Sequence, residues 1–176
     1  MNKGHKMLKR LTLAAMLIAM SVVIGIFCKS VLNFAGGLMR ITFENLPIIL
    51  GGIILGPIWA GAIGLVSDLS SYFLSPQAFA PMPIVTLGAV LIGVVSGIVS
   101  RYIIRRRGSL RIILTVSAAH LIGSMAVKTV GLFTIYGWAV LVRIPIYILI
   151  TAVEALLICL LYKNSGFRRM AEELEK

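Results

Sequence analysis

The sequence contains few acidic residues and few charged residues of either sign. Only 6 of its 176 residues are Asp or Glu, against 17 Lys and Arg, and charged residues make up 13% of the chain. Hydrophobic residues account for 59%, and the mean hydropathy is +1.01. A water-soluble globule of this size needs more polar surface than this composition supplies. The composition excludes an ordinary soluble domain and indicates a protein solvated by lipid.

Residues that carry metal or nucleophilic chemistry are also scarce. The two cysteines, Cys28 and Cys159, lie far apart in apolar segments, and no HExxH, GxSxG or P-loop motif is present. We therefore predict no metal site, no cofactor and no catalytic residues. An intramembrane hydrolase or lipid transferase stays open as an alternative, and it would require a nucleophile paired with a base.

The net charge of +11 could suggest binding to nucleic acid. Binding along a phosphate backbone requires basic side chains gathered on one water-exposed surface. Here the basic residues are scattered between long apolar runs, so we predict no nucleic-acid partner.

The apolar runs predict six membrane-spanning helices. The first run follows a basic leader like that of a secretory signal, but no Ala-x-Ala cleavage site follows it. Gly56-Pro57 divides a run that is too long for one helix, because proline cannot donate the backbone hydrogen bond of a continuing helix. The fold class is an all-α integral membrane protein, a single six-transmembrane-helix bundle over residues 1–176. The expected helices are 11–28, 44–56, 58–75, 83–104, 110–136 and 139–163, followed by a short, solvated C-terminal tail, 164–176.

The basic residues orient this bundle. Thirteen of the seventeen lie before the first helix, in the turn between the fourth and fifth helices, or after the sixth helix. Loops rich in Lys and Arg remain in the cytoplasm. We therefore predict that both termini are cytoplasmic.

Small residues recur every four positions, a spacing that lets helices approach closely. Gly52, Gly56, Ala60 and Gly64 predict close packing inside the bundle. Ala15 and Ala19 on the first helix leave two possibilities open, either packing inside the bundle or a smooth docking face for another protein.

Charged residues within the apolar segments are the candidate functional residues, because an unpaired charge in lipid is costly. Asp68 and Lys128 should lie at similar depth below the outer ends of their helices, as a structural ion pair or as the polar floor of a ligand cavity. Arg143, at the outer start of the last helix, is suited to an anionic ligand. Arg40 is a further candidate for a carboxylate contact, although it could instead pair with Glu44.

Four aromatic residues gather at the same outer level, and either of two roles is possible for them. They could form an interfacial belt or a stacking wall for a planar ligand. These residues are Tyr72, Phe79, Tyr136 and Trp138.

The combined pattern resembles a known family, the substrate-binding S-components of energy-coupling factor vitamin transporters, over nearly the whole chain. The features that carry the resemblance are the basic leader, Ala15-x-x-x-Ala19, the run 40–47 (RITFENLP), the Leu-Gly-Pro turn at 55–57, Ser67-Asp68, the Arg-rich inner loop, and Arg143 opening the last helix. The runs 128–137 and 143–145 with Glu154 are most similar to the folate-binding branch. Some members of that branch carry Asn and Trp where this chain has Lys128 and Gly131.

The resemblance implies a membrane-embedded subunit that binds a vitamin near the extracellular face of the bacterial plasma membrane, and the folate-like runs favour folate. It implies association with an energy-coupling transmembrane subunit and two cytoplasmic ATPases, and release of the vitamin by toppling within the bilayer. The alternatives are an S-component for pantothenate, riboflavin or thiamine, or a structural protein without a ligand.

Overall fold

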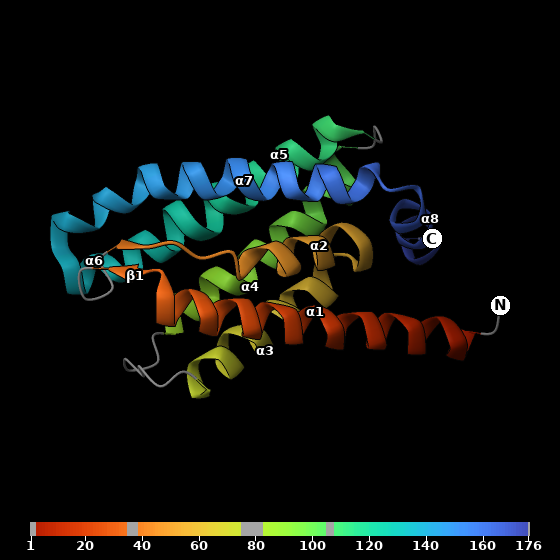
Figure 1. Cartoon of the computed structure of the whole chain (residues 1–176), viewed down its shortest axis with the longest axis horizontal. Coiled ribbons are helices and arrows are strands. Elements are labelled where there is room, and N and C mark those ends of the chain that lie inside the picture. Colours follow the sequence, from red (N-terminus) through yellow and green to blue (C-terminus); the bar gives the residue numbers. More distant parts are fainter. Residues whose placement is uncertain (1–2, 35–38, 75–82, 105–107, 176) are drawn as a thin grey trace.

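A computed structural model describes residues 3–34, 39–74, 83–104 and 108–175 as a helical bundle with one very short β pairing (Figure 1). In chain order the elements are α1 (Lys3–Val31), β1 (Asn33–Phe34), β2 (Met39–Arg40), α2 (Asn45–Leu55), α3 (Pro57–Phe73), α4 (Pro83–Ile98), the π-helix η2 (Val99–Ile103), α5 (Ser109–Ala119), the π-helix η3 (His120–Lys128), α6 (Thr129–Tyr136), the 3-10 turn η4 (Gly137–Val142), α7 (Arg143–Lys163) and α8 (Ser165–Glu175).

The bundle has two distinct ends. The beginning of α1 lies at one end together with α8, and we call this the termini end (Figure 1). The antiparallel pairing of β1 with β2, α6 and the beginning of α7 lie at the opposite end, which we call the hairpin end. Both termini therefore lie at the same end of the bundle, as an even number of crossings requires.

Within the described ranges, three helical stretches are long and apolar enough to cross a membrane, namely Gly4–Val31, Pro83–Ile103 and Ser109–Lys163. The last of these contains two arms, because Gly137 has a φ of 54° and begins the turn η4 that reverses the chain. Glycine adopts this left-handed backbone without the steric penalty of a Cβ.

The α2 helix is shorter than the expected crossing segment. Its 11 residues are all buried, and at ~1.5 Å per residue the helix covers only about half the hydrocarbon thickness. It contacts α1, α3, α4, α7 and α8. A helix that is apolar on every face is stable in this position because protein surrounds it.

The break between α2 and α3 lies at Gly56-Pro57, where the sequence predicts it. Gly56 has a φ of 97°, and Pro57 is the first residue of α3. Arg101 donates to the carbonyl oxygen of Ile54 at 2.8 Å. A cation at this position satisfies a carbonyl group left unpaired at the C-terminus of α2.

The small residues bring α4 against α2 and α3, as the four-residue spacing predicts. A Cβ on Gly64 would lie 2.5 Å from the carbonyl oxygen of Ala89, and one on Gly93 would collide with the carbonyl group of Ala60. A Cβ on Gly52 would meet Ser96. Any larger side chain at these positions would separate the helices.

The C-terminal segment is not simply a solvated tail. Residues Ser165–Glu175 form α8, which contacts α1, α2 and α7 and buries Ala171 and Leu174. Lys9 donates to Glu173 at 2.9 Å, and Arg10 donates to the carbonyl oxygen of Leu174 at 3.0 Å. The α1 helix begins at Lys3, eight residues before the expected start, so its basic first turns reach α8.

Candidate ligand site at the hairpin end

Arg143 lies at the hairpin end in an aromatic environment. The reversal at η4 makes it the first residue of α7, and its side chain is 8% exposed. Its Nη1 lies 3.5 Å from the hydroxyl oxygen of Tyr147, and its Cζ lies 5.6 Å from the centroid of the Tyr136 ring. A guanidinium beside an aromatic ring offers a planar fork of N–H donors, a shape that matches a planar anion such as a carboxylate.

Lys128 is the second buried cation of this region. It ends η3 and is 7% exposed. Its Nζ is 3.4 Å from Oδ1 of Asn45, the first residue of α2, and its aliphatic chain lies against Gly88, where an added Cβ would be 2.6 Å from Cγ. Among the described residues Lys128 has no ion-pair partner. A buried ammonium is costly without a counter-charge, so an anionic ligand would stabilise it.

Asp68 does not pair with Lys128 in the described part of the chain. Its Oδ2 accepts a hydrogen bond of 2.6 Å from Thr86 of α4, and its side chain is half-buried. The structural ion pair considered for these two residues is therefore absent there, and each contacts a neutral partner. Similar depth in the bundle does not place two side chains on facing helix surfaces.

For the remaining predicted site residues, the structure describes no contact with Lys128 or Arg143, apart from the Tyr136 ring beside Arg143. Trp138 is 77% exposed and makes an edge contact with Phe133, with ring centroids 5.4 Å apart. Tyr72 makes a similar contact with Phe73 on α3. Phe79 and the side chain of Arg40 lie outside the described part of the structure, although the backbone of Arg40 pairs with Asn33.

Two polar residues near the cations were not among the predicted site residues. Asn45 approaches Lys128, and Tyr147 approaches Arg143. Asn45 begins the buried helix α2, and Tyr147 lies four residues after Arg143 on the same helix face. This i, i+4 spacing could have indicated Tyr147 from the sequence, whereas the contact between positions 45 and 128 required the fold.

A fully buried polar cluster lies deeper, where η3 faces α7. Nε2 of His120 is 2.7 Å from Oε2 of Glu154, and Nδ1 of His120 is 3.1 Å from Oγ of Ser124. The order Ser, His and carboxylate is that of a hydrolytic triad. All three residues are 0% exposed, so no substrate can reach the serine oxygen. The cluster therefore joins the two helices through buried hydrogen bonds.

On α1, Ala15 and Ala19 are exposed, whereas Ala14, Leu17 and Ser21 face the bundle. The possibility that Ala15 and Ala19 pack inside the bundle does not agree with this orientation. Met16 and Met20 are also exposed, about 100° further around the helix, so this side of α1 is available to lipid or to another protein.

Comparisons with known proteins agree with this arrangement. Residues 9–168 match the family model described as "ECF transporter, substrate-specific component", where ECF denotes energy-coupling factor. A solved structure described as "Crystal structure of FolT bound with folic acid" is similar to this fold, with a TM-score of 0.66 and 24% sequence identity over 85% of this chain and 89% of the other. No curated protein matches the chain.

Proposed function

This chain belongs to the family of substrate-specific components of ECF transporters, and we propose that it is a high-affinity folate-binding subunit. Members of this family are multi-pass membrane proteins that bind substrates for transport rather than act as enzymes. The proposed subunit captures the vitamin from the extracellular side of the bacterial plasma membrane. The observation that carries the proposal is the pair of buried cations at the hairpin end, Lys128 and Arg143.

The chemistry of folate suits these two residues. Folate combines a flat pterin with an aryl amide and two glutamate carboxylates. Arg143 offers a planar fork of donors beside Tyr136, and Lys128 offers a buried ammonium without an ion-pair partner in the described ranges. The two carboxylates of one ligand would suit the guanidinium fork of Arg143 and the ammonium of Lys128. Asp68, Tyr72, Trp138, Phe79 and Arg40 remain candidates for contacts with the pterin or with the closing loops.

The proposed orientation places the hairpin end outside the cell and the termini end in the cytoplasm. The termini end is rich in basic residues. Besides those in the first turns of α1, its elements carry Arg101, Arg111, Lys163 and Arg168. Cytoplasmic loops carry such an excess of Lys and Arg. A ligand bound between η3 and the beginning of α7 would then be accessible from the extracellular side.

Delivery into the cell would need partners. No nucleotide-binding motif is present in the sequence, and the family implies an energy-coupling transmembrane subunit and two cytoplasmic ATPases. We propose the exposed Ala15 and Ala19 face of α1 as the docking surface for the coupling subunit. Small side chains allow close helix contact, and van der Waals packing drives helix association in lipid.

Another vitamin is the second candidate, because the resemblance in fold to the folate-bound protein is at only 24% identity. Pantothenate is also anionic and could use Lys128 or Arg143. Riboflavin is flat and uncharged, and thiamine is cationic, so neither supplies an anionic group for Lys128 or Arg143.

Mass spectrometry of the small molecule retained by the full-length protein, purified in mild detergent from cells grown with all four vitamins, tests the proposal. We expect folate or a reduced folate in about equimolar amount. Retention of pantothenate, riboflavin or thiamine instead would keep the family assignment and overturn the substrate.

A further inference from the structure

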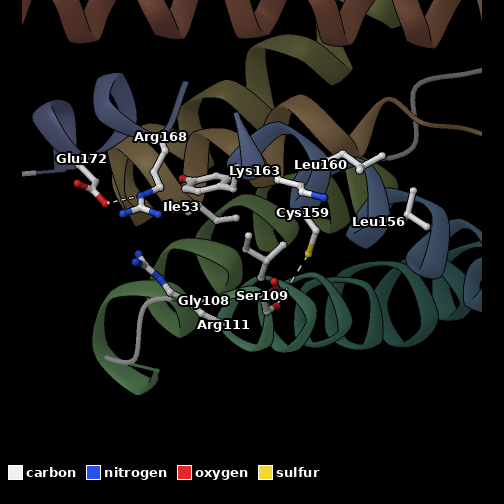
Figure 2. Close-up of a pocket in the computed structure, with 12 residues that line it drawn as sticks. Ile53, Gly108, Ser109, Arg111, Leu156, Cys159, Leu160, Lys163, Arg168 and Glu172 are labelled. Atoms are coloured by element: carbon white, nitrogen blue, oxygen red, sulfur yellow. Dashed lines mark hydrogen bonds and ion pairs between the residues drawn. The ribbon is translucent and has the colours of Figure 1, made fainter. Parts of the chain in front are cut away.

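A pocket of about 560 Å³ opens at the termini end, at the opposite end of the bundle from the proposed vitamin site. The beginning of α5, the last turns of α7 and one face of α8 form its walls (Figure 2). None of the residues discussed for folate binding lines it.

The lining of this pocket is divided into a charged part and an apolar part. Arg111, Lys163 and Arg168 supply three cations, and Glu172 supplies one carboxylate. In Figure 2 the guanidinium groups of Arg111 and Arg168 lie on one side of the pocket, while Leu156 and Leu160 lie on the other side. The pocket therefore has the polarity of an amphiphile, with a place for an anionic group and a place for a hydrocarbon chain.

The apolar side is continuous with the outer surface of α7. Leu156 is 58% exposed and Leu160 is 55% exposed, and Leu149 extends the same exposed apolar surface along the helix. In a membrane protein this surface contacts acyl chains. A lipid could extend from the bilayer along α7 and place its headgroup between the cations.

The charged side is not fully neutralised. Glu172 accepts a hydrogen bond of 3.3 Å from Arg168, an i, i+4 pair in which the Arg168 side chain is 65% exposed. Lys163 has no hydrogen-bond or ion-pair partner among the described residues. Exposed pairs of this kind are weak and exchange readily. A phosphate oxygen can therefore replace Glu172 on Arg168. In Figure 2 the Lys163 amino group points toward Cys159, and its long, flexible side chain would have to turn to meet the same phosphate group.

From this geometry we propose that the pocket is a binding site for an anionic phospholipid, which places its phosphodiester at Arg168, draws the flexible Lys163 side chain toward it, and lays one acyl chain along Leu156 and Leu160. Basic pockets between helix ends recognise lipid headgroups through the same combination of charge and apolar wall. A bound lipid would connect α5, α7 and α8 at the end of the bundle from which a vitamin must leave.

The test is native mass spectrometry of the full chain with dipalmitoyl phosphatidylglycerol and dipalmitoyl phosphatidylcholine at equal concentrations. We expect preferential retention of one phosphatidylglycerol. Lys163→Gln and Arg168→Gln should each weaken that affinity about fivefold. Glu172→Gln should strengthen it, because it removes the competing carboxylate. The matched control is Arg169→Gln, which removes an exposed cation from α8 outside the pocket and should change the affinity little.

Cys159 gives a readout at the pocket itself. Its Sγ lines the pocket 4.0 Å from the carbonyl oxygen of Ser109, whereas Cys28 is 2% exposed and should react slowly. Maleimide should therefore label Cys159 more slowly in phosphatidylglycerol nanodiscs than in phosphatidylcholine nanodiscs.

Three results would overturn the proposal. The first is equal retention of the two lipids. The second is an equal loss of affinity in Arg168→Gln and Arg169→Gln, because this would indicate nonspecific attraction to the basic surface. The third is displacement of phosphatidylglycerol by an equal concentration of inorganic phosphate, which would indicate a site for a free anion.

Discussion

The two ends of the bundle hold their cations in different ways. At the termini end, Lys9 and Arg168 pair with carboxylates on α8, and Arg10 and Arg101 donate to backbone carbonyls at helix ends. At the hairpin end, Lys128 and Arg143 are buried, and the contacts described for them are with an amide and with tyrosine side chains.

This difference follows from solvation. An exposed cation gains little free energy from a neighbouring carboxylate or carbonyl group, because water or lipid headgroups already stabilise its charge. A buried cation such as Lys128, which has no ion-pair partner among the described residues, is stabilised less, so it gains more from an anionic ligand. We therefore propose different roles for the two sets of cations: those at the termini end hold helices together, and Lys128 and Arg143 at the hairpin end bind the substrate.

The largest effect is expected on transport, from changes on α1 that spare ligand binding at either end of the bundle. The double change Ala15→Trp and Ala19→Trp on the exposed face of α1 should abolish folate uptake and capture of the coupling subunit, because bulky side chains prevent close helix contact. Folate affinity of the isolated subunit should remain unchanged, as measured by calorimetry. Met16→Trp with Met20→Trp is the control, because it places two tryptophans at exposed positions about 100° around α1 from the alanines, and it should leave uptake largely intact. Normal uptake by the alanine double variant would refute the docking proposal.

The second largest effect is expected on folate affinity, when the Arg143 guanidinium at the hairpin end is removed. Arg143→Ala should weaken folate binding roughly ten- to a hundredfold, since a charge-assisted hydrogen bond is worth ~1.5–3 kcal/mol. Arg169→Ala removes an exposed cation at the termini end and should leave the affinity unchanged. Equal affinities for the two variants would place Arg143 among the structural residues.

A smaller change in affinity is expected for Lys128→Met. Methionine keeps an unbranched apolar chain against Gly88 and removes only the ammonium group, so folate affinity should fall by about tenfold at most. Thermal stability should not fall, because the variant no longer buries a charge that lacks an ion-pair partner among the described residues. A marked loss of stability would show that Lys128 has a structural charge partner.

The smallest effect is expected for Lys9→Gln at the termini end. Lys9 donates to Glu173 and lowers the pKa of that carboxyl group. Such a contact stabilises the fold above the ordinary carboxyl pKa, and its contribution is lost as the pH falls through the lowered pKa. Wild type should therefore be slightly more stable than the variant at neutral pH, and the two should converge in acid. Thermal unfolding at both pH values measures this, and folate affinity should be the same.

The sequence predicted local features better than contacts between helices. Gly56-Pro57 specifies the break between α2 and α3 because both residues act through their own backbone. Asp68 and Lys128 were placed at similar depth, but their rotation about the helix axes was unknown, so the contacts with Thr86 and Asn45 were not predicted. The π-helical stretch η3 alters that rotation further.

The packing of α8 was missed for a related reason. The charges of this segment are typical of a solvated helix, while Ala171 and Leu174 are too few to indicate a buried face on their own. Their burial depends on the extra turns of α1, which bring Lys9 and Arg10 to α8. A basic leader gives no sequence signal for where its helix begins.

Isothermal titration of the isolated subunit, without ATP or partners, tests the central claim most directly. Folate, pantothenate, riboflavin and thiamine would be titrated separately into the same preparation. A Trp59→Phe background leaves Trp138 as the only tryptophan, so its fluorescence can report on the hairpin end in parallel. The account predicts saturable heat for folate at one site per chain, with quenching of Trp138, and no comparable binding of the other three. Absence of heat with folate and its reduced forms, together with clear binding of another vitamin, would contradict it.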